Sequence, residues 1–317
     1  MSIVSGSSRE DGKATRAVGA DELSELIARL RDTSLVDDLK REWGKIHVSI
    51  EIFLDCIYAE AFTALEILQW ARVQLPGGGT GSPLDLPRES TTFLEVGAGA
   101  GLFSSFLQLH GYRVCALEPA AQAFEYSHDL CRRLQRIFGI TLNQLQLEGR
   151  GLDPAVHGKF DVIFSVNVVE HFQPLQENLA GMARALSDRG TMVHTCPNYW
   201  VPYEPHFRLP LVPIWPQTTR YLVPARIRES GLWKSFNFVN YGDIVDYANR
   251  NGLRASFRQS ALATTLRRLD TDPAFALRHR GPVKTIGKIM NRVGLTSLLE
   301  RLPDRWSTPM TFQLDRR

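Results

Sequence analysis

Three alternating glycines follow an acidic residue near the start of the chain's central third. Residues 93–101 read FLEVGAGAG, with Glu95 before Gly97, Gly99 and Gly101. Glycine lacks a Cβ, so the backbone at these positions can take a positive φ and approach a ligand closely. A helix that begins after such a turn presents unpaired N–H groups to the same space. The segment therefore predicts a strand, a tight turn and a helix start that cradle a nucleotide.

The spacing of these glycines separates two kinds of nucleotide site. A dinucleotide fingerprint has its third glycine at the position that Leu102 occupies here. The pattern found here is instead G-x-G-x-G after Glu95, and a second apolar segment, residues 112–118, ends in Glu118. A carboxylate at that point can accept hydrogen bonds from both hydroxyls of a ribose, so we expect Glu118 to hold one.

A third motif lies after these two. Residues 160–171 read FDVIFSVNVVEH, an apolar run that ends in Asn167, Glu170 and His171. Continuous apolar runs are typical of central parallel strands, whose carboxyl ends lie at a ligand crevice. A helical segment over 175–186 and a strand over 191–196 follow.

Together these motifs resemble the class I S-adenosylmethionine-dependent methyltransferases over roughly residues 91–198. The resemblance implies S-adenosyl-L-methionine as the cofactor, with the amino group oriented by Glu95, the ribose held by Glu118 and the methionine part lined by Asn167. The full set of cofactor-binding residues that it implies is Glu95, Gly97, Ala98, Gly99, Gly101, Glu118, Pro119 and Asn167. The adenine contact stays open between the backbone at Gly149 or Arg150 and Asp153.

The order of the segments predicts the fold class. We expect strands at 92–96, 112–117, 142–147, 160–168 and 191–196, with helices at 101–110, 120–138 and 175–187. Such alternation implies a parallel sheet covered on both faces. A helix at 241–251, a strand at 255–261, a helix at 283–302 and a strand at 310–314 resemble the end of the family's sheet. The expected fold is α/β, a Rossmann-like doubly wound seven-stranded sheet with its seventh strand antiparallel.

The regions outside the core divide the chain further. We expect a disordered N-terminus (1–20), an N-terminal helical region (21–75), a linker (76–90), the cofactor-binding core (91–198), a lid (199–240) and a C-terminal part that completes the sheet (241–317). In the helical region Asp21 caps a short helix, and a longer helix runs from about Leu35 to Val73. These helices either only pack on the sheet, or form a cap over the substrate or a homodimer face.

The lid segment is rich in proline and aromatic residues. Seven prolines between positions 197 and 224 exclude a long helix, and the accompanying tyrosines, tryptophans and phenylalanine are too many for a solvated linker. A lid over the acceptor fits this composition. A purely structural proline-rich segment is the alternative.

Methyl transfer requires alignment of the acceptor with the methyl group and, for some acceptors, a base. His171 follows the fourth strand at the crevice; the alternative is that it caps or packs on the next helix. His206 lies in the segment Pro202-Tyr203-Glu204-Pro205-His206, where two prolines stiffen the backbone, and is slightly preferred as the base. The predicted catalytic set is His206, His171, Glu204 and Tyr203. A metal site in Glu170, His171, Glu204 and His206 lacks a helical i, i+4 ligand pair, so no metal is predicted.

Composition and charge restrict the class of protein. Of the 317 residues 44% are apolar and 22% charged, which is typical of globular proteins. Four scattered cysteines favour a reducing cytoplasm over a disulfide framework. Residues 200–317 contain 19 Lys and Arg against 9 Asp and Glu, a net charge of +10. Without a lysine-rich stripe with interleaved aromatics, this charge does not favour nucleic acid.

The sequence thus predicts a cytoplasmic methyltransferase that acts on an oxygen of a small-molecule or glycan acceptor, with a lid histidine as base. Three alternatives remain. They are N- or C-methylation of a secondary metabolite, action on a lipid-linked acceptor at a membrane surface, and a non-catalytic partner subunit with the same fold. The membrane alternative depends on Trp200, Trp215, Trp233 and the basic helix expected at 283–302.

Overall fold

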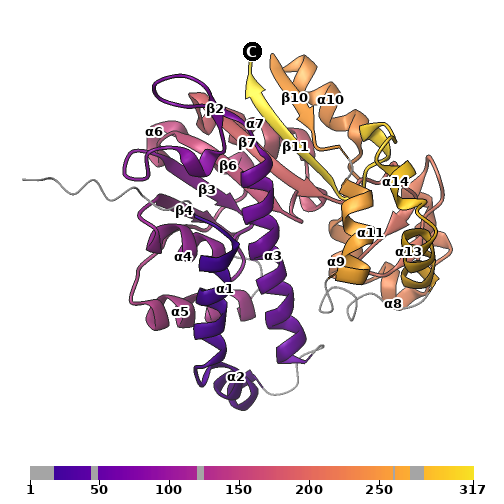
Figure 1. Ribbon diagram of the computed structural model, residues 1–317, viewed down its shortest axis with the longest axis horizontal. Helices are drawn as coiled ribbons and strands as arrows, with labels where there is room; N and C mark the ends of the chain where they lie inside the picture. Colours follow the sequence, from indigo (N-terminus) through magenta and orange to yellow (C-terminus); the bar gives the residue numbers. More distant parts are fainter. Residues whose placement is uncertain (1–17, 44–48, 120–124, 260, 272–281) are drawn as a thin grey trace, which may run out of the picture.

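A seven-stranded sheet forms the centre of the molecule (Figure 1). The structure is a computed structural model that describes residues 18–43, 49–119, 125–259, 261–271 and 282–317. The strands lie in the order β10-β11-β7-β6-β3-β4-β5. Their bounds are β3 (Thr92–Val96), β4 (Arg113–Leu117), β5 (Asn143–Leu145), β6 (Phe160–Val166), β7 (Leu186–Cys196), β10 (Leu253–Phe257) and β11 (Met310–Arg316).

Six of these seven strands run in the same direction, and β11 is inserted in the opposite direction. β3, β4, β5, β6 and β7 pair in parallel. β11 lies between β7 and β10 and is antiparallel to both. The predicted α/β fold with an antiparallel seventh strand is confirmed. β10 covers 253–257 rather than 255–261.

Alternate side chains of the central strands enter two separate cores, as the two-residue period of a strand requires. Phe93 and Phe164 pack with α4 (Leu102–Leu109) on one face of the sheet. Leu94 and Ile163 pack on the other face with α7 (Leu175–Ala185) and α10 (Tyr241–Arg250). The sheet is therefore covered on both faces. It is also flanked by α5 (Glu125–Phe138) and α6 (Pro154–His157).

The N-terminal helices differ from the prediction in two details. The expected helix over 35–73 is two helices, α2 (Leu35–Trp43) and α3 (Ile50–Trp70), and residues 44–48 lie outside the described part. The N-cap of α1 (Ala20–Arg31) is Gly19, not the predicted Asp21. The main-chain N–H of Gly19 donates to Glu22 Oε2 at 3.1 Å, so the carboxylate of Glu22 satisfies a group at the start of the helix that has no partner within the helix.

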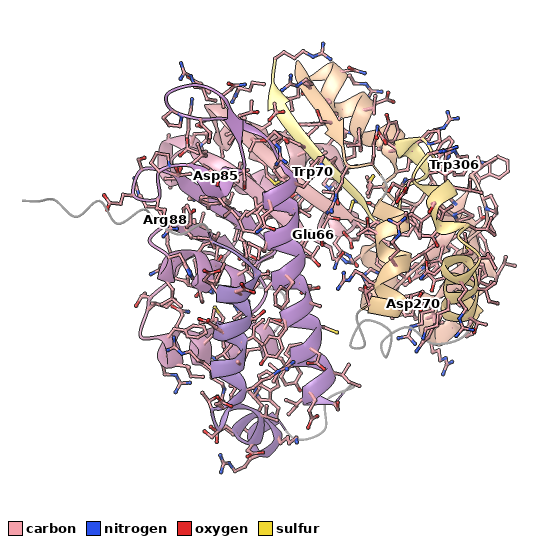
Figure 2. All side chains as sticks on the ribbon, viewed as in Figure 1. Glu66, Trp70, Asp85, Arg88, Asp270 and Trp306 are labelled. Carbon is pink, nitrogen blue, oxygen red and sulfur yellow. The ribbon has the colours of Figure 1, made fainter. Side chains whose placement is uncertain are left out.

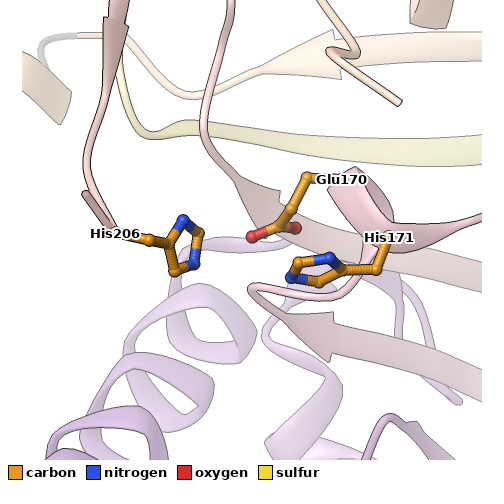
Figure 3. Close-up of side chains that lie close together, drawn as sticks. All are labelled: Glu170, His171 and His206. Atoms are coloured by element: carbon orange, nitrogen blue, oxygen red, sulfur yellow. The ribbon is translucent and has the colours of Figure 1, made fainter. Parts of the chain in front are cut away.

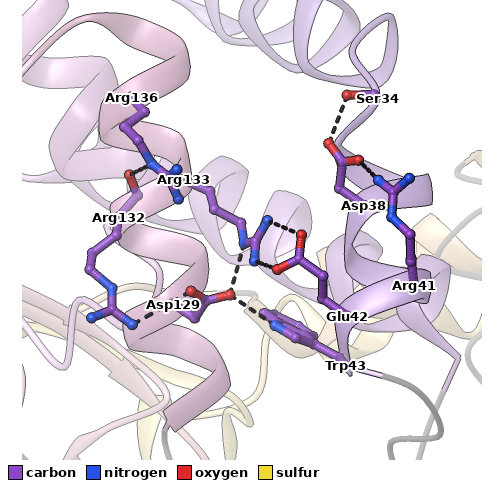
Figure 4. Close-up of polar contacts among 9 residues, drawn as sticks. All are labelled: Ser34, Asp38, Arg41, Glu42, Trp43, Asp129, Arg132, Arg133 and Arg136. Atoms are coloured by element: carbon purple, nitrogen blue, oxygen red, sulfur yellow. Dashed lines mark hydrogen bonds and ion pairs between the residues drawn. The ribbon is translucent and has the colours of Figure 1, made fainter.

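α3 packs along the sheet and connects the other N-terminal helices to it. Its buried face includes Leu54, Ala61 and Leu65, which share one core with α1, α4 and the sheet. A polar network fastens α2 to α5: Arg133 pairs with Glu42 and Asp129, and Trp43 Nε1 donates to Asp129 Oδ2 at 2.9 Å (Figure 4). The apolar stripes are thus buried within the chain, and a homodimer through these helices stays a prediction.

The segment predicted as a linker contains short regular structure. β1 (Val73–Gln74) and β2 (Thr80–Gly81) form a small hairpin, followed by η1 (Pro83–Asp85). Figure 2 labels Trp70 at the end of α3 and Asp85 beyond this hairpin. The predicted linker and domain boundaries stay predictions. The predicted disorder of residues 1–20 falls almost wholly outside the described residues.

The lid region has its own aromatic core. It contains β8 (Tyr203–Glu204), β9 (Leu209–Pro210), η5 (Pro216–Tyr221), α8 (Ala225–Arg228) and α9 (Gly231–Ser235). The buried members of that core are Tyr199, Leu211, Trp233, Phe236 and Phe238. Asn237 fastens the region to the sheet, because its main-chain N–H donates to the Glu170 carbonyl and its side chain to the Val169 carbonyl. The aromatic residues therefore form a packed subdomain after β7.

The C-terminal part holds one helix that the sequence did not predict. α11 (Ala261–Thr271) packs on α13 (Pro282–Arg292) and α14 (Thr296–Leu299), before η6 (Asp304–Trp306). The single helix predicted at 283–302 is interrupted by Gly294, whose φ is 74°. Within the described ranges no helix combines the length and apolar composition needed to span a membrane.

Candidate active site

The carboxyl ends of the parallel strands meet where the strand order reverses, between β3 and β6. In open α/β sheets this is the place of the ligand crevice. The turn after β3 and the segment after β6 touch there: a Cβ added to Gly97 would lie 2.3 Å from Val168 Cγ2. Glycine at this position allows the two segments to approach.

The three glycines of the turn all have positive φ but face different surroundings. At Gly101 an added Cβ would meet Cys131 and Leu142 at 2.9 Å, so this glycine permits packing. At Gly99, with φ of 51°, no described atom lies within 4 Å of an added Cβ. Gly99 is thus the glycine of the turn that borders open space. Ala98, between Gly97 and Gly99, donates its N–H to the Leu117 carbonyl at 3.1 Å and ties the turn to β4.

Two carboxylates lie beside this turn without a positive partner. Glu118 Oε2 accepts the Gly99 N–H at 2.8 Å, and burial raises the pKa of Glu118. Burial raises the pKa of Glu95 to about 8, although a hydrogen bond from the Ser104 hydroxyl opposes the rise. Among the described residues neither forms an ion pair with lysine or arginine. A ligand with an ammonium group and ribose hydroxyls fits these acceptors.

Asn167 and α3 enclose the crevice from the other side. Asn167 has a φ of 55°, so β6 ends at Val166 rather than at the predicted residue 168. The side chain of Asn167 donates from Nδ2 to Glu60 Oε1 at 3.5 Å. Glu60 also acts electrostatically on Glu95 and Glu170. Sequence reasoning missed Glu60, because α3 lies far from the motifs along the sequence. Together these carboxyl groups line the crevice with oxygen atoms, and a sulfonium cation bound there would favour their ionised forms.

Two other predicted positions have ordinary structural contacts. Pro119 follows Glu118 and is half-buried. Asp153, one of the open candidates for the adenine, caps α6 by accepting the Ala155 N–H at 2.9 Å, and Arg150 pairs with Glu148 at 2.7 Å. The predicted roles of these residues toward the cofactor stay predictions.

Glu170 is the most unusual polar group on the acceptor side of the crevice. It lies on η4 (Val169–His171), is 0% exposed, and neither of its carboxylate oxygens has a hydrogen-bond partner among the described residues. Burial raises its pKa to about 8, and His206 opposes this rise. A buried carboxyl without a partner is costly, so a donor that binds in the crevice would stabilise it.

His206 is held by a buried carboxylate. Glu204 accepts hydrogen bonds from His206 Nδ1 at 2.6 Å and from the main-chain N–H groups of His206 and Phe207. Burial lowers the pKa of His206, but the Glu204 hydrogen bond and the charges of Glu204, Glu170 and Glu60 outweigh this and leave the pKa raised. Because Nδ1 carries the proton toward Glu204, Nε2 presents a lone pair, and 27% of the side chain is exposed.

His171 lies in a different electrostatic environment. Its Nδ1 lies 2.7 Å from Ser235 Oγ, which itself donates to the Leu232 carbonyl, so we assign the His171 proton to Nδ1. Burial, together with the nearby His206, lowers the pKa of His171 to about 4, although the charge of Glu204 opposes this shift. His171 is therefore neutral at physiological pH.

The side chains of Glu170, His171 and His206 lie together although they come from two distant segments of the chain (Figure 3). The ring centroids of His171 and His206 are 5.9 Å apart, and Phe236 packs against both rings at 5.3 and 5.1 Å. Phe236 and Ser235 were not predicted. The structure brings Glu204, His206 and His171 together as the sequence suggested. Tyr199, rather than Tyr203, donates a hydrogen bond to Glu204, at 3.4 Å.

Among the described residues, Glu170, His171 and His206 form a group that could hold a metal ion. One ligand atom from each lies within 4.8 Å of the others. Zinc ligands lie about 2.0–2.2 Å from the ion, so two of them are at most roughly 4.4 Å apart. Ligand atoms that lie within 4.8 Å of one another are near this spacing, and the absence of a metal stays a prediction.

Comparison with known proteins assigns this protein to a family. Residues 75–270, more than half of the chain, match the family model described as a methyltransferase domain. The chain belongs to this methyltransferase family. The match extends on both sides of residues 91–198, and it includes the whole lid. The matched residues include both the glycine turn and the segment that holds Glu204 and His206, so the crevice described above lies within the methyltransferase domain.

Two curated relatives and two solved structures are similar to this methyltransferase. The proteins MT1557 and Rv1509 of Mycobacterium tuberculosis are each 29% identical over 195 residues, which cover 58% of this chain and 65% of theirs. The chain thus spans less than two thirds of their length. Phosphoethanolamine N-methyltransferase 2 of Haemonchus contortus is 14% identical, with a TM-score of 0.48 over 90% of this chain and 60% of that one. The plantazolicin methyltransferase BpumL is 13% identical, with a TM-score of 0.40 over 93% and 99%. Likenesses at this level do not identify the acceptor.

Proposed function

We propose that this methyltransferase methylates an oxygen of a small-molecule or glycan acceptor and that His206 is the general base. The observation that carries the proposal is the Glu204–His206 pair. A buried carboxylate fixes Nδ1 at 2.6 Å and leaves Nε2 outside this hydrogen bond, on a side chain that is 27% exposed. A hydroxyl must lose its proton as it attacks, and a histidine with a raised pKa suits this transfer.

The residues divide the work between two sides of the crevice. S-adenosylmethionine, when bound, supplies the methyl group as a sulfonium. On the donor side Glu95 and Glu118 accept hydrogen bonds from the cofactor, and Gly99 leaves room for it. On the acceptor side His206 Nε2 accepts the hydroxyl proton, and Glu204 and Glu170 stabilise the imidazolium that forms. The remaining contribution is alignment of the acceptor oxygen with the methyl group.

His206 is preferred to His171 for an electrostatic reason. The Glu204 carboxylate favours the protonated state that a base must reach, whereas burial and the neighbouring His206 disfavour a charge on His171. His171 and Phe236 would then position His206 and the acceptor rather than take the proton.

Product analysis tests the proposal. The protein is incubated with methyl-labelled S-adenosylmethionine and separate sets of hydroxyl-bearing sugars, phenols, carboxylic acids and amines, and each methylated product is characterised by NMR. We expect an O-methyl product whose formation is lost in His206→Ala. An N- or C-methyl product would overturn the acceptor assignment. Cofactor binding without transfer to any set would instead support the non-catalytic alternative.

A further inference from the structure

Exposed apolar residues are concentrated in one part of the molecule. Of the 18 large hydrophobic residues that are exposed in the described ranges, 13 lie between residues 200 and 306. This segment contains the lid and the helices α11, α13 and α14, which form the lobe at the right of Figure 1. Apolar surface concentrated in this way marks an interaction site.

α13 has an apolar stripe on its outer side. The opposite side packs on α11: a Cβ added to Gly287 would lie 2.5 Å from Leu269 Cδ1, and Asn291 Nδ2 donates to the Leu266 carbonyl at 2.8 Å. At about 100° per residue, Ile286, Ile289 and Val293 point away from this contact. All three are more than half exposed. The stripe is therefore not needed to hold the helix in place.

The lid contributes a second apolar projection. Ile214 and Trp215, between Pro213 and Pro216, are 84% and 64% exposed. Ile214 also has a φ of 69°, which is rare for a β-branched residue. Trp200 and Trp306 form an exposed edge-to-face pair with centroids 6.1 Å apart, and Figure 2 labels Trp306 in this lobe.

Positive charge accompanies the apolar surface. Residues 200–317 carry a net charge of +10, whereas residues 1–199 carry −7. On α13 itself Lys288 and Arg292 flank the stripe at one edge. Amphipathic helices that bind a membrane surface combine an apolar face with flanking lysine and arginine, and tryptophan is favoured at the same interface.

We propose that the outer side of α13, together with α14, docks onto a membrane surface that contains anionic lipid, and that the exposed Ile214 and Trp215 of the lid add apolar surface to the same lobe. A second copy of the chain fits less well, because a two-fold contact would bring two strongly basic surfaces together. If the proposed function holds, this docking means that the enzyme binds its acceptor at a lipid surface. The docking itself does not depend on which atom is methylated.

Co-sedimentation with vesicles tests the docking. The full chain is mixed with phosphatidylcholine vesicles with and without phosphatidylglycerol. The apolar variant is Ile286→Gln/Ile289→Gln, and its control, Ile137→Gln/Val156→Gln, changes two exposed residues outside this lobe. The charge variant is Lys288→Gln/Arg292→Gln, with Arg113→Gln/Arg189→Gln as a control of equal charge.

We expect binding only to vesicles with phosphatidylglycerol, weakened about tenfold or more by each α13 variant and little by either control. S-adenosylmethionine affinity, measured on the same variants, should not change, and a failure of the proposed methyl transfer would leave the vesicle result unaffected. Absence of binding to anionic vesicles would overturn the proposal. So would equal binding by the α13 variants, or self-association in sedimentation velocity that these variants abolish.

Discussion

The donor side and the acceptor side of the crevice are built in different ways. Glu95, the glycine turn and Glu118 belong to one consecutive strand-turn-helix-strand unit. The acceptor side instead joins η4, the turn after β8 and the end of α9, which lie far apart in the sequence. Contacts within one unit are fixed by local backbone geometry, whereas contacts between distant segments depend on how the lid packs.

The two sides also differ in how their carboxylates are satisfied. Glu118 and Glu95 each accept a hydrogen bond from the protein. Glu170 accepts none within the described part of the chain, although it is the most deeply buried of the three. The donor side is therefore organised before a ligand binds. The acceptor side keeps an unsatisfied group that a bound acceptor can engage.

The largest expected effect separates the two sides by their kinetic roles. His206→Ala should lower kcat by roughly 10²–10⁴-fold, because it removes the base, while S-adenosylmethionine affinity stays close to that of the wild type. His171→Ala should cost much less. Steady-state kinetics and calorimetry measure the two quantities. If both variants keep a normal kcat, the acceptor needs no base and alignment accounts for catalysis.

The second prediction concerns the donor side. Gly99→Val places a side chain in the open space beside the turn and should weaken S-adenosylmethionine binding by about tenfold or more. Gly139→Val is the matched control, because Gly139 also has a positive φ, 65°, and no described atom within 4 Å of an added Cβ. The backbone strain is therefore similar in both variants. Equal affinities in calorimetry would show that Gly99 does not border the cofactor.

The third prediction is a dependence of kcat on pH. The base acts in its neutral form, so kcat should fall by about tenfold per pH unit below the His206 pKa, which lies above its ordinary value of 6.5. Glu204→Gln removes the carboxylate that favours the imidazolium, and the inflection should move to lower pH. Glu170, Glu60 and His171 also face His206 and remain in this variant. If the inflection in kcat stays at the same pH in Glu204→Gln, Glu204 does not set the pKa of the base.

The fourth prediction concerns stability on the acceptor side. The pKa of Glu170 rises from 4.5 to about 8 on folding, so the folded state binds the proton more tightly and wild-type stability falls as pH rises from 4.5 to 8. Glu170→Gln cannot ionise and should be more stable than the wild type by roughly 1–4 kcal/mol at pH 8, with the gap closing near pH 4.5. Denaturant unfolding at both pH values measures the gap. Glu89→Gln, at an exposed position, should change stability little.

The smallest expected effect is that of metal removal. Because Glu170, His171 and His206 include no helical i, i+4 ligand pair, we expect EDTA to leave kcat unchanged. A loss of activity that zinc restores would reassign these three residues as a metal site. It would also replace the role proposed for His206.

Much of the donor side was predictable because its signals are local. An apolar run, an acidic residue and alternating glycines define a strand and a turn through backbone conformation alone, and the predicted strand 92–96 is β3. The antiparallel last strand was implied by the resemblance to the methyltransferase family, and it is confirmed in β11. The strand and the turn depend on neighbours in the sequence, whereas the pairing of β11 with β7 does not.

The errors and omissions share a different cause. Two predictions were wrong, namely the cap at Asp21 and the single helix over 35–73, and α11 was missed. The ends and breaks of helices depend on which groups compete for the free main-chain N–H and carbonyl groups, as Glu22 does for the Gly19 N–H. Glu60, Tyr199, Ser235 and Phe236 carry no motif at all. They reach the crevice because α3 packs along the sheet and the lid's aromatic core folds back onto η4. Local residue types thus specify the cradle for the donor, whereas long-range packing assembles the surroundings of His206.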